Sequence, residues 1–143
     1  MFITQEQFDT IYKLGMEEQK MKKKILISIN PEHVQNIIKG IKKYEYRKIA
    51  AKQDISSIII YETTPVKRIV AEAEIIDVLM YSPEELWKLT KEEAGISKEF
   101  FDEYFEGKEI AYAYKLGKIK VYDEPKTLLE YGIKAAPQSF VYI

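Results

Sequence analysis

Charged residues gather around a single glycine in the stretch IIKGIKKYEYRKIA, residues 37–50. The five basic residues there are Lys39, Lys42, Lys43, Arg47 and Lys48. If residues 44–48 form a strand, Glu45 and Arg47 lie on one face, because strand side chains alternate between faces. Gly40 lets the backbone approach a ligand closely. A lysine ammonium, a planar arginine and one carboxylate can bind a phosphate and a base edge together.

The same stretch has a plainer interpretation. Lys39 and Lys42 favour the C-terminal end of a helix, and the residues that follow can be exposed positions of an edge strand. Glu45 can equally pair with Arg47 and hold it in place. From the residues alone, a charged surface is the favoured interpretation, and an anion site is the alternative.

Composition excludes several kinds of chemistry. The chain has no cysteine, which rules out a disulfide scaffold, thiolate metal ligands and cysteine nucleophiles. His33 is the only histidine, and no cluster of metal ligands surrounds it in the sequence. Neither glycine-rich nucleotide-binding motif is present. We therefore expect no metal ion and no cofactor.

The net charge of −1 conceals an uneven distribution. Residues 1–70 hold 13 lysines and arginines against 8 acidic residues, whereas residues 71–143 hold 9 against 15. A polyanion is therefore expected to meet the first half of the chain. The acidic residues of the second half are best explained as solvated helix faces. Core packing best explains the aromatic run, which consists of Phe100, Phe101, Tyr104 and Phe105.

Periodicity and capping residues predict an α+β chain. Helices are expected in residues 4–19 and in three further segments, which begin after Asn30, Ser82 and Ser97. These three residues are suited to cap the helices that follow them. Strands are expected at residues 25–29, 42–48, 56–62, 66–80 and 139–143, with two more around a turn at Leu116-Gly117. Strands and helices do not alternate regularly, so a mixed or antiparallel barrel-like sheet with flanking helices is favoured.

Several segments together resemble the ASCH domain, a family of the PUA-like superfamily. The resemblance begins at residues 26–29, continues through Pro31-Glu32 and extends to the C-terminus through segments such as SPEELWKLT and APQSFVYI. Its central motif, G-x-K-x-x-E-x-R, is carried by Gly40, Lys42, Glu45 and Arg47, followed by Lys48. The resemblance implies a small PUA-like mixed β-barrel. We expect residues 21–143 to form this domain and residues 1–20 to be a helical extension.

The family is thought to bind RNA or nucleotide-like ligands, and its small bacterial and phage members are often labelled as transcriptional regulators. Carried over by position, the motif residues would line the cleft. Tyr44 or Tyr46 can stack on a base, although packing in the barrel explains each of them at least as well. Lys48 is also expected among the binding residues. Loop positions beside the strand ends complete the expected binding residues: Thr63, Thr64, Gln138 and Ser139.

Some relatives in the superfamily are amidohydrolases that act on acetylated cytidine. They resemble this chain in having a lysine where Lys42 stands and a carboxylate that can match Glu74. They carry a threonine where Glu45 stands, so this chain departs from them at a catalytic position. Catalysis by Lys42, Glu45 and Glu74 is therefore an alternative to binding alone, as is RNA cleavage by a ribonuclease mechanism.

The N-terminal region bears on location and partners. No apolar run reaches the length of a membrane helix, and residues 1–20 contain acidic residues where a signal peptide has a continuous apolar core. We expect a cytoplasmic protein with no membrane partner. A further alternative makes the helix in residues 4–19 a docking element for another protein.

Overall fold

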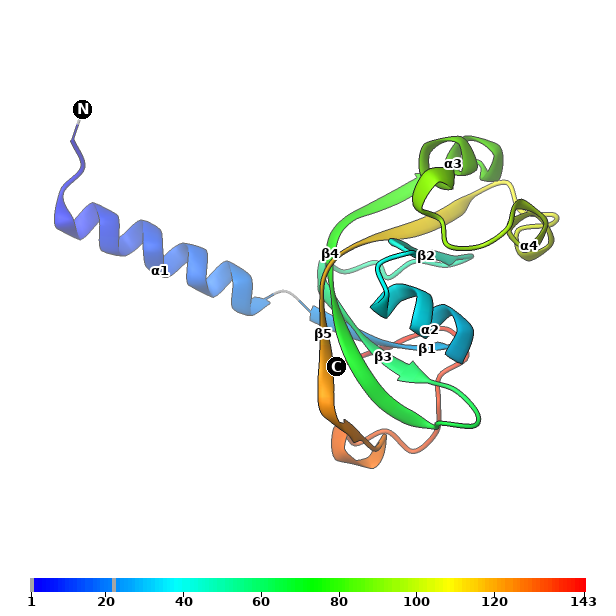
Figure 1. Cartoon of the computed structure of the whole chain (residues 1–143). Coiled ribbons are helices and arrows are strands. Elements are labelled where there is room, and N and C mark those ends of the chain that lie inside the picture. Colours follow the sequence, from blue (N-terminus) through cyan, green and yellow to red (C-terminus); the bar gives the residue numbers. More distant parts are fainter. Residues whose placement is uncertain (1, 22) are drawn as a thin grey trace.

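A six-stranded curled sheet forms the body of the molecule (Figure 1). The computed structural model describes residues 2–21 and 23–143. In order across the sheet the strands are β2 (Tyr44–Arg47), β5 (Ala111–Lys126), β4 (Arg68–Tyr81), β3 (Ile55–Glu62), β1 (Lys23–Ile29) and β6 (Val141–Tyr142). The β1–β3 pair is parallel, and the other pairs are antiparallel. The predicted mixed, barrel-like α+β fold is confirmed.

Helices flank this sheet at its open side and at one end (Figure 1). They are α2 (Pro31–Ile38), α3 (Pro83–Thr90) and α4 (Lys98–Tyr104), with short 3₁₀ helices η1 (Lys91–Glu93) and η2 (Leu129–Tyr131). A further helix, α1 (Gln5–Met21), precedes β1. The side-chain oxygens of Ser82 and Ser97 accept hydrogen bonds from the Glu85 and Phe100 amides, so both serines cap helices as predicted. Asn30 precedes α2 in an extended conformation, although its side chain makes no capping bond.

One predicted turn is wrong. Leu116-Gly117 lies inside the single long strand β5, where the sequence pattern indicated a turn between two strands. A Cβ atom on Gly117 would lie 2.5 Å from Glu74 Oε1 and 2.9 Å from Ile76 Cγ1 on the neighbouring strand. The β4–β5 register shifts close to this point. Glycine is therefore needed here for the close approach of two bent strands, not for a chain reversal.

Three apolar clusters hold the elements together. The largest packs β1, β3 and α2 against the β4–β5 ladder, and it includes Ile25, Ile27 and Tyr114. A second cluster joins α3 and α4 to β2 and β5 through Phe101, Phe105 and other residues. This second cluster matters for function, because it fixes α4 beside β2.

Helix α1 projects away from the sheet (Figure 1). It is joined to β1 through residue 22 alone. The final strand is shorter than expected: β6 covers only Val141–Tyr142 of the predicted residues 139–143. No helix among the described residues is long and apolar enough to cross a membrane.

Candidate functional site

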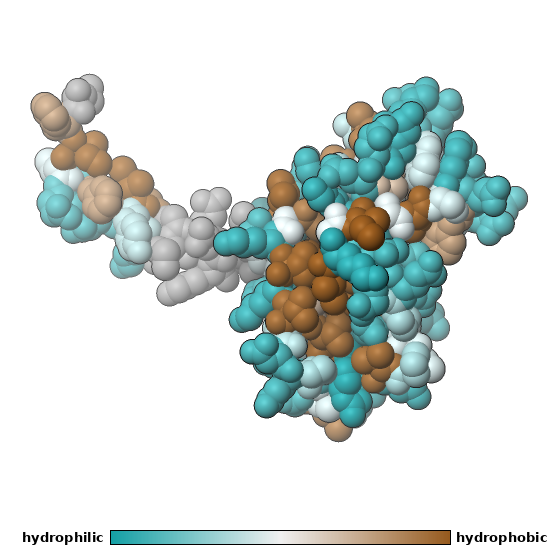
Figure 2. All heavy atoms as spheres, in the orientation of Figure 1, coloured by the Kyte–Doolittle hydropathy of each residue, from teal (hydrophilic) through white to brown (hydrophobic). Residues whose placement is uncertain are grey.

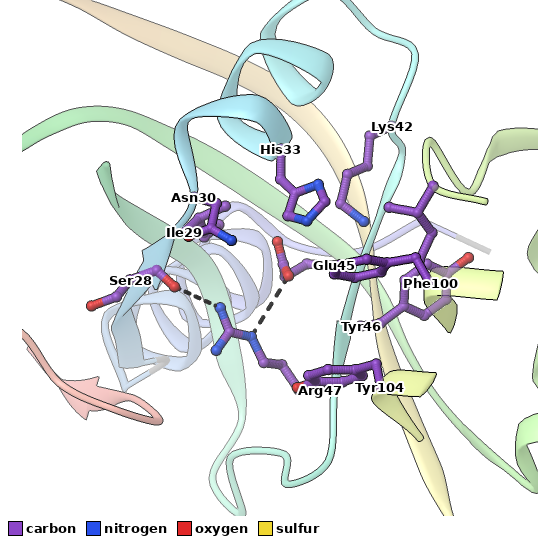
Figure 3. A pocket seen from close by; sticks show the side chains of 11 residues that line it. Ser28, Ile29, Asn30, His33, Lys42, Glu45, Tyr46, Arg47, Phe100 and Tyr104 are labelled. Carbon is purple, nitrogen blue, oxygen red and sulfur yellow. Dashed lines mark hydrogen bonds and ion pairs between the residues drawn. The ribbon is translucent and has the colours of Figure 1, made fainter. Parts of the chain in front are cut away.

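A small cleft opens where β1 ends, α2 begins, and β2 and α4 face each other (Figure 3). Its cavity volume is about 170 Å³. Pockets for drug-sized ligands usually hold roughly 300–1,000 Å³, so this cleft suits one ring or one phosphate. Its lining residues are Ser28, Ile29, Asn30, His33, Lys42, Glu45, Tyr46, Arg47, Ile96, Phe100 and Tyr104.

Lys42 is the most deeply buried cation of the cleft, with 3% of its surface exposed. Its Nζ donates to the Ala94 carbonyl oxygen at 3.4 Å and lies 4.7 Å from the centre of the Tyr46 ring. Burial lowers the pKa of Lys42, and Arg47 lowers it further, whereas Glu45 opposes the change. The amine is therefore easier to deprotonate than an ordinary lysine.

Glu45 and Arg47 point from the same face of β2, as the two-residue period predicts. Arg47 Nε lies 3.6 Å from Glu45 Oε1, and Arg47 Nη2 donates to the Ser28 carbonyl at 2.8 Å. Both side chains are largely enclosed. Glu45 Oε2 and Arg47 Nε are buried and have no hydrogen-bond partner among the described residues. Unpaired buried polar atoms are costly, so one acceptor and one donor of this pair keep unused hydrogen-bonding capacity beside the cleft.

His33 faces the same space from the first turn of α2 (Figure 3). Its ring packs edge-on against Phe100, with centroids 5.2 Å apart. Nδ1 is buried without a hydrogen-bond partner among the described residues. Burial lowers the pKa of His33, and the nearby Lys42 charge lowers it further. The imidazole is therefore held in its neutral form near neutral pH.

Aromatic side chains of α4 form the opposite wall. Phe100 is 44% exposed, and Tyr104 lies beside it on the cleft side. Phe101 and Phe105, on the other face of α4, are buried in the second apolar cluster. The aromatic run is therefore divided: half of it is core, as expected, and half lines the cleft.

This fold has counterparts among known proteins. The family model described as "ASCH domain" matches residues 27–120, about two thirds of the chain. The chain belongs to the ASCH domain family. The crystal structure of ASCH from Zymomonas mobilis superposes with a TM-score of 0.77 at 29% identity, covering 85% of this chain and 87% of that one. The ASCH domain is PUA-like, so the predicted fold class is confirmed as well.

The relatives that match this chain have different names. An ASCH domain-containing ribonuclease of Z. mobilis is 33% identical over 96 residues, covering 66% of this chain and 65% of the relative. A protein of Ureaplasma parvum named large ribosomal subunit protein uL22 is 28% identical over 130 residues, covering 90% of this chain. Only 42% of that relative is matched, so the chain spans less than half the length of the uL22 proteins.

Three residues of the G-x-K-x-x-E-x-R segment lie together in the cleft: Lys42, Glu45 and Arg47. Gly40 lies outside it, in a separate groove that also contacts Lys42. Tyr44 is 7% exposed and packs in the second apolar cluster, so its ring has no free face for a base. Lys48 lies beside the cleft, where its Nζ is 4.7 Å from the Tyr104 ring centre.

The loop residues added to the site are near its rim or apart from it. Thr63 Oγ1 donates to Asn30 Oδ1 at 3.4 Å, which places Thr63 behind the lining. Pro137, which precedes Gln138 and Ser139, accepts a hydrogen bond from the Ser28 hydroxyl. Thr64, Gln138 and Ser139 do not line the cleft. Glu74 lines a different hollow, with Lys24, Ser57 and Glu72.

Sequence reasoning missed His33, Asn30 and Phe100 as members of the site. The position of Asn30 and His33 in the sequence could have indicated them, because they lie between the end of a buried strand and the first turn of the next helix. Phe100 carried no comparable signal, because the side of α4 that faces the cleft depends on how α4 packs. Within the described part of the chain, no group of three or more histidine, aspartate and glutamate side chains is placed to hold a metal ion.

Proposed function

We propose that this cleft binds single-stranded RNA and takes one nucleotide at a time. The observation that carries the proposal is the buried pair of open polar atoms, Glu45 Oε2 and Arg47 Nε, beside an exposed aromatic ring. An RNA-binding site that reads unpaired bases combines hydrogen bonds to a base edge with stacking on an aromatic or arginine plane. The name of the Z. mobilis relative, a ribonuclease, supports RNA as the polymer.

Each lining residue has a role in this proposal. Glu45 Oε2 accepts from a base N–H, while Lys42 and Arg47 provide positive charge for a phosphate or a base carbonyl. Phe100 stacks on the base. Two cations against one carboxylate leave the cleft weakly positive, which suits one phosphate better than a long duplex backbone.

The cleft also has groups that suit RNA cleavage, which is our second candidate function. Neutral His33 lies near Lys42, and both have lowered pKa values. In this scheme His33 takes the proton of a ribose 2′-hydroxyl, the 2′-oxygen attacks phosphorus, and the bond to the 5′-oxygen breaks, with water protonating the leaving oxygen. Lys42 and Arg47 stabilise the charge on the phosphoryl oxygens. The products are a 2′,3′-cyclic phosphate and a free 5′-hydroxyl.

An amidohydrolase site built on Lys42, Glu45 and Glu74 has less support. Glu74 is on β4 and lines another hollow, beside the close approach of Gly117. The three side chains do not share one cavity, so we do not extend the proposal to modified nucleosides. If the domain binds RNA without cleaving it, it has the properties of a regulatory RNA-binding module.

Fluorescence anisotropy with labelled short RNA, single-stranded DNA and duplex DNA tests the binding proposal. We expect RNA to bind best, Arg47→Lys to weaken binding by losing the planar fork, and Lys52→Ala to leave it unchanged, since Lys52 is an exposed cation outside the cleft. Circular dichroism would confirm that each variant is folded. Equal binding by wild type and the Arg47 variant would contradict the proposal.

The same RNA, analysed on a denaturing gel, separates binding from cleavage. If the cleft cleaves RNA, His33→Gln should abolish the appearance of a cyclic phosphate product while RNA still binds. Intact RNA after prolonged incubation with wild type would remove the second candidate and leave the first standing.

A further inference from the structure

A second hollow lies on the other side of Lys42 from the cleft. It is a groove between the C-terminal end of α2 and the β4–β5 ladder, with a cavity volume of about 350 Å³. Figure 2 shows apolar atoms gathered over β4 and β5 beside α2. The apolar lining residues are Ile37, Ile76, Leu116 and Ile119, together with Gly40 and Gly117. Ile76 is 58% exposed, so this apolar surface faces solvent.

Helix α1 carries an apolar stripe that is equally exposed. Phe8, Ile11 and Tyr12 lie along one face of the helix, and each is more than half exposed. The rings of Phe8 and Tyr12 stack with centroids 6.4 Å apart. Most of the stability of a helix in a protein comes from packing of its apolar face against another surface. The stripe therefore needs a partner surface.

The charges around the stripe and the groove are complementary. The described side chains of α1 include two acidic residues, Glu6 and Asp9, against one basic residue, Lys13. The charged residues at the surface of the groove are Lys43, Lys115 and Glu93; Lys43 Nζ pairs with Glu93 Oε2 at 2.8 Å, so Lys115 supplies the net positive charge. An amphipathic helix with a net negative charge therefore meets an apolar groove with a net positive charge at Lys115, and such complementarity favours docking and fixes its register.

The connection between α1 and β1 determines which copy of the groove α1 can occupy. Figure 1 shows α1 leading away from the sheet where β1 starts. The stripe is thus carried away from the groove of its own domain and presented to another molecule.

We propose that α1 of one copy docks in the α2–β4–β5 groove of a second copy, and that the exchange is reciprocal. Two identical contacts related by a twofold axis close the assembly as a dimer and leave no free stripe or groove. The arrangement goes beyond the proposed RNA function, because it does not depend on any ligand in the cleft.

Sedimentation velocity of the full chain tests the dimer. We expect a dimer for wild type and monomers for Ile11→Glu and Ile76→Glu, because each change puts a charge into the apolar contact. Thr10→Glu, on the opposite side of α1, and Leu129→Glu, an exposed position on η2, are matched controls that should remain dimeric. A wild-type chain that is monomeric at every concentration would overturn the proposal.

Mixing the two monomeric variants distinguishes this arrangement from pairing between two α1 helices. The Ile11→Glu chain keeps an intact groove and the Ile76→Glu chain keeps an intact α1, so their mixture should form a heterodimer through one remaining contact. If Ile76→Glu remains a dimer by itself, the groove is not the docking surface and the proposal fails.

The absence of cysteine makes disulfide trapping a direct second test. A mixture of Ile11→Cys and Ile76→Cys chains should give a crosslinked heterodimer under oxidising conditions, while Ile76→Cys alone should not crosslink. Crosslinking by Ile11→Cys alone would instead indicate contact between two α1 helices and would contradict the proposal.

Discussion

At the scale of single residues, the cleft depends on how closely the chain packs around Lys42. The Ala94 carbonyl accepts from Lys42 Nζ, and Gly95 follows directly with a positive φ of 68°. A Cβ atom on Gly95 would overlap the Cα and Cβ atoms of Lys42. Gly95 therefore allows the loop after η1 to cover Lys42, and it helps to determine where the buried amine lies.

Replacing Gly95 should cost more stability than replacing a glycine of similar backbone conformation in open space. Gly107 has a φ of 77° and nothing within 4 Å of a built Cβ, so Gly107→Ala should cost about 1–2 kcal/mol from backbone strain alone. Gly95→Ala should cost a further ~1–3 kcal/mol because the methyl group overlaps Lys42. Urea unfolding measures both; equal losses would show that the overlap relaxes freely.

The lowered pKa of His33 makes stability depend on pH below the ordinary histidine value of 6.5. The unfolded chain binds this proton at a higher pH than the folded chain, so stability should rise as pH rises towards 6.5 and then level off. Lys42, Glu45, Glu32 and Arg47 face this imidazole. His33→Gln should flatten the rise in the free energy of unfolding, measured by denaturant titration at several pH values. An unchanged slope would contradict this assignment.

At the scale of elements, α4 serves two purposes with its two faces. One face packs into the second apolar cluster and the other supplies the aromatic wall of the cleft. Ser97 starts the helix by accepting from the Phe100 amide at 3.1 Å, so the cap sets the position of the residue that we expect to stack on a base. Core packing therefore holds the wall in place.

Substitutions at two neighbouring phenylalanines of α4, Phe100 and Phe101, distinguish ligand stacking from core packing. Phe100→Ala should weaken RNA binding by about 1–3 kcal/mol, the usual worth of one stacked base, with little loss of stability. Phe101, which is 1% exposed, should lose about 3–5 kcal/mol of stability when changed to alanine. Anisotropy and thermal unfolding of both variants make the comparison. If Phe100→Ala binds RNA like wild type, the stacking role is wrong.

At the scale of the whole molecule, charge is distributed so that only the first half of the chain favours a polyanion. Residues 71–143 hold 15 acidic residues, including those at the start of α3 and in α4. An acidic surface close to the cleft restricts how much of a nucleic-acid backbone can be contacted. Under the proposed function, we therefore expect the molecule to contact only a short single-stranded segment.

This restriction predicts a shallow salt dependence. One or two phosphate contacts on a single strand correspond to a slope of about −0.7 to −1.4 in a plot of log affinity against log salt concentration. Anisotropy titrations over a range of salt concentrations give the slope, with duplex DNA as the comparison. A much steeper slope would mean that a broad basic surface outside the cleft binds the RNA.

Much of the fold could be predicted because it depends on neighbours in the sequence. Ser82 and Ser97 cap the helices that follow them, and the strand period puts Glu45 and Arg47 on one face. These are local effects of hydrogen bonding and backbone geometry, so they are visible in the order of residues. The same is true of the excluded thiol chemistry, which follows from composition alone.

What the tertiary structure decided depends on contacts between distant segments. Tyr44 is buried and Phe100 is exposed because of the way α4 packs on β2, and Glu74 is directed away from the cleft by the strand on which it lies. Gly117 looks like a turn residue until β4 is placed against it. His33 joins the site because α2 turns its first residues towards β2. Each outcome requires two segments far apart in the chain to pack together, and no local pattern of residue types specifies that packing.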